Sequence, residues 1–376
     1  MTEKYLHIVS FNIPYPANYG GVIDVFYRIK ALSENNVKII LHAFEYGRKP
    51  MDELNSYCEK VYYYKRKTGF RSQLSTLPYI VYSRRNNELL YNLQQDNYPI
   101  LFEGLHCCYY LSHPALKNRL KFVRMHNIEH KYYKGLLKNT RSLHKKIFFG
   151  IESCRLKQFE QNLQNADYIL ALSTTENAYF EKTYGKEKTR FVPLFAPAQI
   201  TELPRNNIKQ YVLFHGDLST PENIYAASFL IKKVAPLDNE IQWIFAGLNP
   251  DKSLLKSARK QSNISIRANL SDNELAQLVN EAAVNILYTN QVSGVKLKLL
   301  NALYNGQHCL ANRAMVTGSN LESLCHIISD KPEEIIAKIR VCMQKQFDEN
   351  ERANRLTILK KWYDNIANAQ KIIELL

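Results

Sequence analysis

The chain alternates short apolar runs with amphipathic stretches, and it does so in two separate series. The first series begins with the apolar run YLHIVS (5–10), and the next stretch, residues 22–35, places its apolar side chains at the spacing of one helical face. Strands that alternate with helices are typical of parallel β-α-β units. The pattern lapses over residues 191–210, which contain three prolines, and then resumes. The sequence therefore predicts an α/β protein with two doubly wound parallel sheets.

The length of the chain agrees with this organisation. A chain of 376 residues is too long for one ordinary core and suits two domains. We place an N-terminal domain at 1–195 and a C-terminal domain at 196–355. The remaining residues, 356–376, belong to one long terminal helix that begins near residue 350, and we expect this helix to return to the N-terminal domain and pack on it.

The sequence lacks export and membrane signals. No apolar run approaches the ~18 residues of a membrane span, and the first residues lack the layout of a signal peptide, so we expect a cytoplasmic protein. Its seven cysteines include no CxxC pair and have no histidines at the spacing of a zinc site. We expect reduced, mostly buried thiols and no bound metal.

Positive charge is concentrated in the first half of the chain. The net charge is +15, and residues 1–190 carry 29 Lys or Arg against 17 Asp or Glu. Two segments, 60–85 and 117–146, combine basic residues with aromatic ones. Such segments suit an anionic membrane surface, and they equally suit nucleic acid or a solvated face without a partner. We favour peripheral attachment to the inner membrane face and expect no nucleic acid partner.

The loops after the strands are where to look for ligands, because parallel α/β sheets bind ligands at the carboxyl ends of their strands. After the first strand comes PYPANYGGV (14–22), in which Gly20 and Gly21 lead into a helix. Glycines at a helix N-terminus let the backbone approach an anion. The same turn is often purely structural, and it lacks the GxGxxG fingerprint of a dinucleotide site.

Three segments of the second half carry a more specific pattern. HGDLSTPENIYAASFL (215–230) has a glycine followed by a proline, an asparagine and a helix; IQWIFAG (241–247) is a strand that ends in Ala-Gly; VSGVKLKLLNALYNGQHCLAN (292–312) has a glycine, basic residues and a helix that ends in Ala-x-x-x-Gly. In this order, and with the opening residues 5–32, they resemble the retaining GT-B glycosyltransferases of the fourth family, also called glycosyl transferases group 1. The likeness runs through almost the whole chain.

The resemblance implies a fold and a reaction. Members have two Rossmann-like domains that face a cleft. A nucleoside diphosphate sugar binds the C-terminal domain, and an acceptor hydroxyl held by the N-terminal domain attacks the anomeric carbon, with retention of configuration and without an obligatory metal. The sugar nucleotide is a co-substrate, and no other cofactor is implied.

Positive charge near the leaving diphosphate stabilises the transition state of such a reaction. Lys296 and Lys298 suit this role, and we expect Lys298 to face the diphosphate because Asn301 shares its helical face and matches the ribose-binding position of the family. The predicted donor-binding residues are Gly20, Gly21, Gly216, Asn223, Gly294, Lys296, Lys298 and Asn301.

Two departures from the family pattern concern this donor site. Many members have glutamates where this chain has Ser293 and Asn301, and an amide bonds hydroxyls without the charge-assisted strength of a carboxylate. The Arg and Lys that many members carry after the first strand of the C-terminal domain are absent from HGDLSTPEN (215–223). Either Lys296 and Lys298 substitute for them, or donor binding is weak or lost.

Two loops of the N-terminal domain place polar groups amid apolar residues: EGLH (103–106) and MHNIEH (125–130). The resemblance puts a histidine beside the transferred sugar on the first loop, so His106, Glu103 and Lys298 are the predicted catalytic residues. The HNxE string of the second loop is similar to an acceptor-side motif, which comprises His126, Asn127 and Glu129.

We therefore expect a hexosyltransferase-like enzyme that moves a sugar to a glycan or lipid-linked acceptor in cell-surface polysaccharide or lipopolysaccharide assembly. Two alternatives are a nucleotide-sugar epimerase of the same fold and a catalytically silent sugar-binding scaffold, the latter suggested by Ser293 and Asn301.

Overall fold

The structure, a computed structural model, describes residues 3–69, 72–140, 142–197 and 208–376. The chain forms two compact units. The N-unit comprises Met1–Pro197 and Tyr363–Leu376, and the C-unit comprises Ala198–Trp362. The alternating pattern lapses over residues 191–210, where we expect the linker between the domains, and residues 198–207 of this stretch lie outside the described part of the chain. Both units have parallel α/β sheets, as the alternating pattern predicts.

The N-unit has a seven-stranded parallel sheet with the order β3-β2-β1-β4-β5-β6-β7. Its strands are β1 (Lys4–Ser10), β2 (Val37–Glu45), β3 (Lys60–Lys65), β4 (Ile100–Glu103), β5 (Lys121–Met125), β6 (Tyr168–Ala171) and β7 (Thr189–Phe191). Its helices are α1 (Gly20–Glu34), α2 (Tyr79–Tyr82), α3 (Asn87–Leu93), α4 (Glu129–Asn139), α5 (Leu143–Glu160), α6 (Thr174–Tyr184) and α14 (Asn365–Ile373).

Successive side chains of β1 enter different cores on the two faces of this sheet. Leu6 and Ile8 belong to one apolar cluster, and Val9 belongs to another. This division is the expected result of the two-residue repeat of a strand whose faces are both covered by helices. The sheet is thus buried on both sides, and only its edges and strand ends are left to bind ligands.

The C-unit has a six-stranded parallel sheet with the order β10-β9-β8-β11-β12-β13. Its strands are β8 (Lys209–His215), β9 (Gln242–Gly247), β10 (Ile264–Ala268), β11 (Ala282–Leu287), β12 (His308–Asn312) and β13 (His326–Ile328). Its helices are α7 (Pro221–Phe229), α8 (Lys252–Ala258), α9 (Asp272–Glu281), α10 (Leu297–Asn305), α11 (Arg313–Val316), α12 (Pro332–Gln344) and α13 (Glu349–Tyr363).

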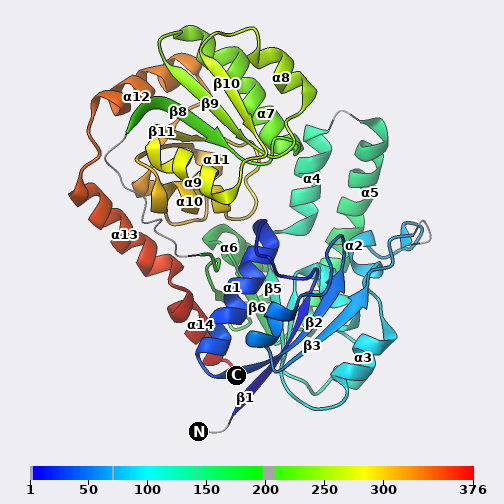
Figure 1. Cartoon of the computed structure of the whole chain (residues 1–376). Coiled ribbons are helices and arrows are strands. Elements are labelled where there is room, and N and C mark those ends of the chain that lie inside the picture. Colours follow the sequence, from blue (N-terminus) through cyan, green and yellow to red (C-terminus); the bar gives the residue numbers. More distant parts are fainter. Residues whose placement is uncertain (1–2, 70–71, 141, 198–207) are drawn as a thin grey trace. The chain divides into compact units, whose positions relative to one another are not determined.

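The single terminal helix expected from about residue 350 is wrong, because the structure has two helices there, α13 and α14. They separate at Asp364, whose carboxylate accepts a hydrogen bond of 2.9 Å from the Ala367 backbone N–H. An aspartate in this position starts a new helix. Only α14 joins the core of the N-unit, where it lies beside α1 (Figure 1).

The predicted basic surface at 60–85 is exposed only in part. Lys65 and Lys67 are exposed, but Arg66 donates a 2.9 Å hydrogen bond to the Ser83 hydroxyl. Arg84 is 4% exposed and donates to the Phe11 carbonyl at 3.0 Å. Part of this positive charge therefore holds the fold together.

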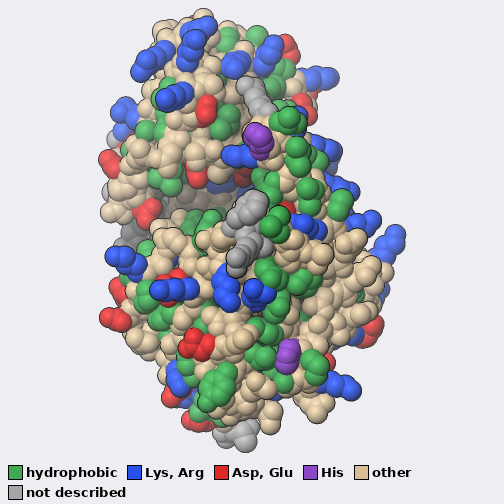
Figure 2. Space-filling model, turned by 90° about the vertical axis from the view of Figure 1, so that its right-hand side faces the viewer, with side chains coloured by type: hydrophobic (Ala, Val, Ile, Leu, Met, Phe, Trp, Pro, Cys, Tyr) green, Lys and Arg blue, Asp and Glu red, His purple; other side chains and the backbone are tan. Residues whose placement is uncertain are grey.

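Figure 2 shows a face of the molecule with more Lys and Arg than Asp and Glu side chains, and with exposed hydrophobic side chains among them. Among the described residues, no helix has the length and hydropathy that a bilayer crossing requires.

Candidate functional site

The carboxyl end of β8 in the C-unit is built around two glycines. Gly216 follows β8 with φ 152°, and a Cβ there would approach the Asn223 side-chain nitrogen to 2.9 Å. Gly247 ends the neighbouring strand β9, and a Cβ there would lie 1.7 Å from the Gly216 carbonyl oxygen. Only glycines allow the two strand ends to pass this closely. Gly216 and Gly247 thus present backbone without a Cβ at the carboxyl ends of β8 and β9, which is where parallel α/β sheets bind ligands.

Lys298 is brought to this edge by α10. Its ammonium donates a 2.9 Å hydrogen bond to the Asn223 side-chain oxygen and lies 5.0 Å from the centre of the Phe214 ring. Burial lowers the pKa of Lys298 to about 8, although the charge of Glu222 opposes this shift. Three of the predicted donor-binding residues, Gly216, Asn223 and Lys298, therefore meet at the end of β8.

Lys296 and Asn301 have different partners. The Lys296 ammonium donates to the Gly294 carbonyl at 2.8 Å, within the loop before α10, and Gly294 itself has φ 73°. The Asn301 side-chain oxygen accepts a 2.9 Å hydrogen bond from the Asn305 amide, one turn further along α10. Lys298, in contrast, donates to Asn223 in the first turn of α7.

His215, the last residue of β8, was missed by the sequence analysis. It is 3% exposed, and its Nε2 is buried without a hydrogen-bond partner in the part of the chain that the structure describes. Burial, aided by the charge of Lys298, lowers the pKa of His215 to about 3, so its ring is neutral. The position directly before Gly216, at a strand end, is the one signal in the sequence that points to it.

Glu103 and His126 belong to a buried network in the N-unit. His126 Nε2 lies 3.0 Å from a Glu103 carboxylate oxygen, and Arg28 donates to the other oxygen of this carboxylate. Arg28 and Arg124 both bond Asp24, at 2.5 Å and 3.0 Å, and all three side chains are fully buried. Burial raises the pKa of Asp24, but the two guanidinium groups outweigh it and hold this pKa below its usual value.

The two carboxylates of this network are satisfied by its arginines. The oxygen and nitrogen atoms of Asp24, Glu103 and His126 lie close enough together to hold a metal ion. However, the carboxylates of Asp24 and Glu103 already accept hydrogen bonds from Arg28, and Asp24 also accepts from Arg124. Removing one partner of such buried pairs typically costs ~3–5 kcal/mol. The group fits a structural role that orients His126 better than a cation site.

His106 is placed by the turn at Gly104, which follows β4 with φ 66°. A Cβ on Gly104 would come within 2.8 Å of His106 Nδ1 and 3.7 Å of His126 Cδ2, so both histidines lie beside this turn. The His106 ring is half-buried and packs on Phe11 at 5.4 Å between centres. Burial, with the charge of Arg84, lowers the pKa of His106 well below its usual value, so the ring is neutral.

Asn127 and Glu129 form a second polar pair at the start of α4. Glu129 is 2% exposed and is hydrogen-bonded to the Asn127 side chain. Burial raises the pKa of Glu129 to about 8, so its carboxyl group is largely protonated at neutral pH. Its Oε1 has no hydrogen-bond partner among the described residues. Apart from His106, the predicted residues of these two loops therefore form two hydrogen-bonded pairs, Glu103–His126 and Asn127–Glu129.

Gly20 and Gly21 open α1, as expected. No side chain among the described residues caps this helix. Gly21 has a packing reason, because a Cβ there would approach the Phe11 ring to 2.6 Å, whereas Gly20 has open space around it. Packing therefore explains the glycine at position 21 and does not explain the glycine at position 20.

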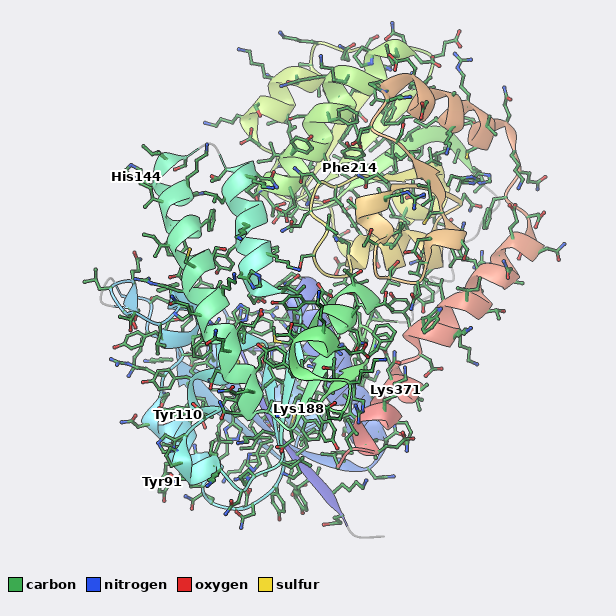
Figure 3. The ribbon with its side chains drawn as sticks, turned by 180° about the vertical axis from the view of Figure 1, so that it is seen from behind. Tyr91, Tyr110, His144, Lys188, Phe214 and Lys371 are labelled. Atoms are coloured by element: carbon green, nitrogen blue, oxygen red, sulfur yellow. The ribbon has the colours of Figure 1, made fainter. Side chains whose placement is uncertain are left out.

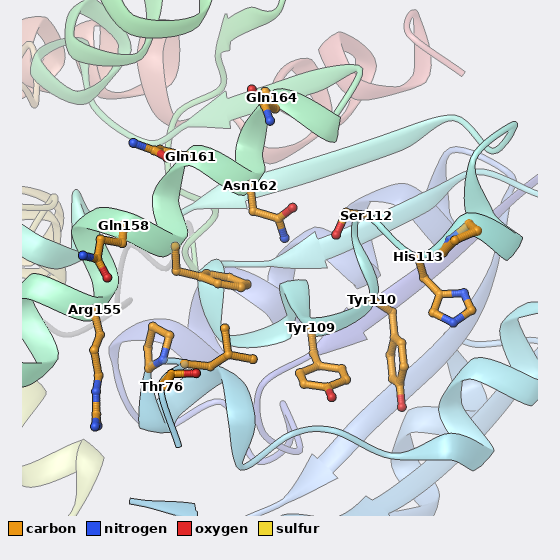
Figure 4. Close-up of a pocket in the computed structure, with 14 residues that line it drawn as sticks. Thr76, Tyr109, Tyr110, Ser112, His113, Arg155, Gln158, Gln161, Asn162 and Gln164 are labelled. Carbon is orange, nitrogen blue, oxygen red and sulfur yellow. The ribbon is translucent and has the colours of Figure 1, made fainter. Parts of the chain in front are cut away.

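The N-unit also contains a cavity of about 800 Å³ that is lined by none of the predicted residues (Figure 4). This volume is in the range of ligand sites. Tyr109 and Tyr110 line it from one side, while Gln158, Gln161 and Asn162 line it from the end of α5 and the following turn. A second cavity of about 430 Å³ shares Gln161 and Gln164 with the first, so the two are adjacent.

Comparison with known proteins adds to this geometry. No protein-family model matches the chain. A curated relative, an uncharacterised 44.6 kDa protein in the cps region of Klebsiella pneumoniae, is 26% identical over 349 residues, which cover 88% of each chain.

The solved structures are similar over nearly the whole length. Sucrose-phosphate synthase from Thermosynechococcus elongatus has a TM-score of 0.68 at 13% identity, with 99% of this chain and 98% of that chain covered. HepE from Anabaena in complex with UDP-glucose has a TM-score of 0.66 at 13% identity and 98% coverage of each chain. TarM has a TM-score of 0.65 at 10% identity, with 100% and 99% covered. All three are GT-B glycosyltransferases.

The chain has the GT-B fold. This confirms the predicted architecture of two Rossmann-like sheets, of seven and six strands. Sequence identities of 10–13% to these GT-B structures establish the fold alone, and the chemistry has to be argued from the site.

Proposed function

We propose that the chain is a glycosyltransferase that moves a sugar from a nucleoside diphosphate sugar to a glycan or lipid-linked acceptor. The observation that carries this proposal is the arrangement of Lys298, Asn223 and Gly216 at the carboxyl end of β8. A half-buried ammonium beside a half-buried backbone edge without bulky side chains suits a diphosphate. HepE, which has the same fold, was solved with UDP-glucose, and this supports the choice of donor.

The donor residues have separate roles in this proposal. Lys298 lies beside the diphosphate and stabilises the charge that develops on it as the sugar leaves. Gly216 and Gly294 let the backbone approach the phosphates, and Lys296 holds the Gly294 loop through its 2.8 Å bond. Asn301 bonds the ribose hydroxyls in place of the family's carboxylate. We propose retention of configuration and no obligatory metal, as the resemblance implies.

The N-unit would bind the acceptor. His106, a neutral ring, would donate or accept a hydrogen bond at the reacting sugar. Glu103 is fully buried and bonded to His126 and Arg28, so we propose that it positions His126 and does not touch the substrate. Asn127 and Glu129 would bond the acceptor side, and Gly20 and Gly21 would leave the start of α1 open to an anionic group of the donor.

The two adjacent cavities of the N-unit would hold an extended glycan. Tyrosine rings pack against the apolar faces of sugars, and side-chain amides bond hydroxyl groups in both directions. The two cations that line the cavities have protein partners: Arg155 pairs with Glu152 at 2.9 Å, and Lys188 donates to the Gln164 carbonyl at 2.8 Å. The lining therefore suits a neutral oligosaccharide.

Variants of this lining test the glycan assignment. Tyr109→Ala and Gln161→Ala should each weaken the binding of neutral oligosaccharides by about fivefold, since a hydrogen bond or ring contact contributes ~1 kcal/mol. Tyr91→Ala, on α3 (Figure 3), and Gln94→Ala, directly after α3, change exposed residues; they are matched controls and should bind as the wild type does. Isothermal titration with di- to octasaccharides measures this, and equal affinities in all five proteins would reject the assignment.

We further propose a role in cell-surface polysaccharide or lipopolysaccharide assembly on the inner face of the membrane. The curated relative in the cps region of Klebsiella pneumoniae supports a polysaccharide role. The exposed apolar residues of α5, which are flanked by lysines, support attachment to an anionic lipid surface.

The decisive experiment is a thermal-shift screen of nucleoside diphosphate sugars, followed by product analysis with and without a glycan acceptor. A true donor stabilises the fold by RT ln(1 + [L]/Kd), and transfer that requires the acceptor supports the proposal. Conversion of the donor sugar without an acceptor identifies an epimerase instead. Binding without hydrolysis or transfer identifies a silent scaffold, as Ser293 and Asn301 suggest. If no donor stabilises the protein, the proposal fails.

A further inference from the structure

Two histidines and a cysteine that are far apart in the sequence meet in the C-unit. His308 is the first residue of β12, His326 is the first residue of β13, and Cys342 lies near the end of α12. One possible ligand atom from each lies within 4.8 Å of the others. None of the three takes part in the proposed transfer reaction, and their spacing along the chain matches no zinc motif.

His308 is prepared to bind a cation through one particular nitrogen. Its Nε2 lies 2.8 Å from the Lys345 carbonyl oxygen. A carbonyl oxygen accepts only, so Nε2 carries the proton and Nδ1 keeps its lone pair. Nδ1 is buried, without a hydrogen-bond partner among the described residues, in a side chain that is 2% exposed. A backbone carbonyl that fixes the tautomer in this way is the usual support of a metal-binding histidine.

The other two side chains complete a suitable ligand set. The His326 ring lies 5.5 Å from the His308 ring between centres and is exposed, which gives a route from solvent. Cys342 is 3% exposed and has a free thiol. Metal–ligand distances of ~2.0–2.3 Å in a tetrahedral site separate the ligand atoms by roughly 3.5 Å. Small side-chain rotations therefore close the arrangement.

Three nearby cations are held by other groups. Lys345 pairs with Glu351 at 2.5 Å, Arg355 donates to the Gly306 and Gln307 carbonyls at 2.8 Å, and Lys338 donates to the Ile327 carbonyl. Their positive charges disfavour a bound cation, and the negative charge of a Cys342 thiolate would offset one of them. A weakly charged, soft ligand set with nitrogen and sulfur selects zinc over magnesium or calcium.

We propose that His308, His326 and Cys342 form a Zn²⁺ site in the C-unit, with solvent as the fourth ligand. On binding, the Cys342 thiol loses its proton to solvent and its sulfur bonds the metal, so one proton is released per ion.

The position of this site in the sheet indicates a structural role. Both histidines begin their strands, whereas ligands of parallel α/β sheets bind at the opposite, carboxyl ends. The metal would join β12, β13 and α12 at the amino end of the C-unit sheet. It would stabilise this unit and leave sugar transfer unchanged, which separates its test from that of the proposed function.

The test uses tag-free, full-length protein stripped of metal and titrated with Zn²⁺ and, for spectroscopy, Co²⁺. We expect one ion per chain, a thiolate-to-cobalt charge-transfer band and a higher melting temperature with Zn²⁺. His326→Ala, on the exposed ligand, should fold normally and bind Zn²⁺ more weakly by at least the ~10–100-fold that changes around metal ligands cause. Cys342→Ser should abolish the charge-transfer band.

Two variants are matched controls, because they remove the same residue types elsewhere. His144→Ala and Cys154→Ser change exposed residues of α5 and should bind Zn²⁺ as the wild type does. Cobalt bound without the thiolate band would place the ion elsewhere, for instance at Asp24, Glu103 and His126, and would overturn the inference. So would a Zn²⁺ affinity that is the same in His326→Ala and wild type, whether or not the chain transfers sugar.

Discussion

Lys298 is the residue on which the proposed donor site depends most. A charge-assisted hydrogen bond contributes ~1.5–3 kcal/mol, so Lys298→Ala should weaken donor binding by roughly one to two powers of ten. Lys296→Ala is the matched control and should do much less, because its ammonium bonds the Gly294 carbonyl. Calorimetry with the donor found in the thermal-shift screen decides between them. Equal donor affinity of Lys298→Ala and wild type would refute this role.

The same lysine predicts a pH dependence of donor binding. Burial holds the pKa of Lys298 at about 8 in the free protein. The protonated form attracts the diphosphate, so donor affinity should fall as the pH rises through about 8. The Lys298→Ala protein has lost this group, and its weaker binding should change little over the same range. Parallel slopes in the two proteins would assign the titration to another residue.

Glu129 predicts a second pH effect, on stability. Its pKa is raised from 4.5 to about 8 in the folded chain, so between these values the folded state holds a proton that the unfolded state has lost. Stability should therefore fall as the pH rises through this window, by ~1.4 kcal/mol per pH unit from this group. Glu129→Gln keeps the shape without the charge and should be more stable than wild type at pH 9, but not at pH 4.

Denaturant titrations of both proteins at several pH values measure this difference. Glu187→Gln, at an exposed position, is the control and should follow the wild type throughout. If Glu129→Gln also follows the wild type, Glu129 ionises normally, and its proposed protonated state on the acceptor side is wrong.

At the scale of elements, α5 has an apolar face that the N-unit leaves uncovered. Leu143, Ile147 and Ile151 recur every four residues and are 68%, 56% and 49% exposed. Lys145 and Lys146 lie between them, and the chain has no acidic residue from 130 to 151. An exposed apolar stripe beside cations is typical of a helix that lies in a membrane interface. Figure 3 shows His144 at the outer end of this helix.

Ile147→Asp should therefore release the protein from vesicles that contain anionic lipid. The wild type should bind them at low salt and lose binding as the salt rises, because exposed charges are screened over ~8 Å at physiological ionic strength. Val341→Asp changes an equally exposed apolar residue, 63% exposed, on α12 and is the control. Co-sedimentation measures the bound fraction. An Ile147→Asp protein that still sediments would exclude α5 as the attachment surface.

The elements differ in how well the sequence predicts them. The regular alternation of apolar runs gave both sheets, because strands buried on both faces have an unmistakable composition. It missed β3, β7 and β13, and β12 was expected only from the family resemblance. β7 and β13 have three residues each, too few for a pattern, and β3 (KVYYYK) resembles a basic surface segment because it is an edge strand. Edge strands commonly carry lysines.

The sites show a similar division. Motif segments predicted Gly216, Asn223 and Lys298, which the structure brings together, since residues near a strand end or a helix start stay together in any sheet of this kind. They did not point to His215, which is distinguished only by its burial near Lys298, or to the group of His308, His326 and Cys342. Contacts between distant segments depend on the register of β12 and β13, in which Leu310 faces His326, and no local pattern records that register.

At the scale of the whole molecule, the chain leaves the N-unit, forms the C-unit and returns. The return is α14, in which Ala369, Ile372 and Ile373 join an N-unit core cluster that includes Leu6 and Ile29. Polar contacts fix the helix as well: Asn365 bonds both backbone groups of Ala196, and Lys4 donates to the Ile373 carbonyl at 2.7 Å. The core of the N-unit therefore includes residues from both the start of the sequence and α14.

This arrangement predicts that a change near the C-terminus destabilises the N-unit and not the C-unit. Ile372 is fully buried, so Ile372→Ala should cost ~2–5 kcal/mol of stability. Ile366→Ala, on the same helix but 58% exposed, should stay within ~0.5 kcal/mol of wild type.

Differential scanning calorimetry, with a donor sugar nucleotide added in parallel runs, separates the units, because the proposed donor site lies in the C-unit. The donor should not shift the melting transition of the N-unit. In Ile372→Ala this transition should move to lower temperature, and at temperatures below it the donor affinity should equal that of wild type. Loss of donor affinity in the folded Ile372→Ala protein, or a melting profile identical to that of wild type, would show that α14 does not serve the N-unit in this way.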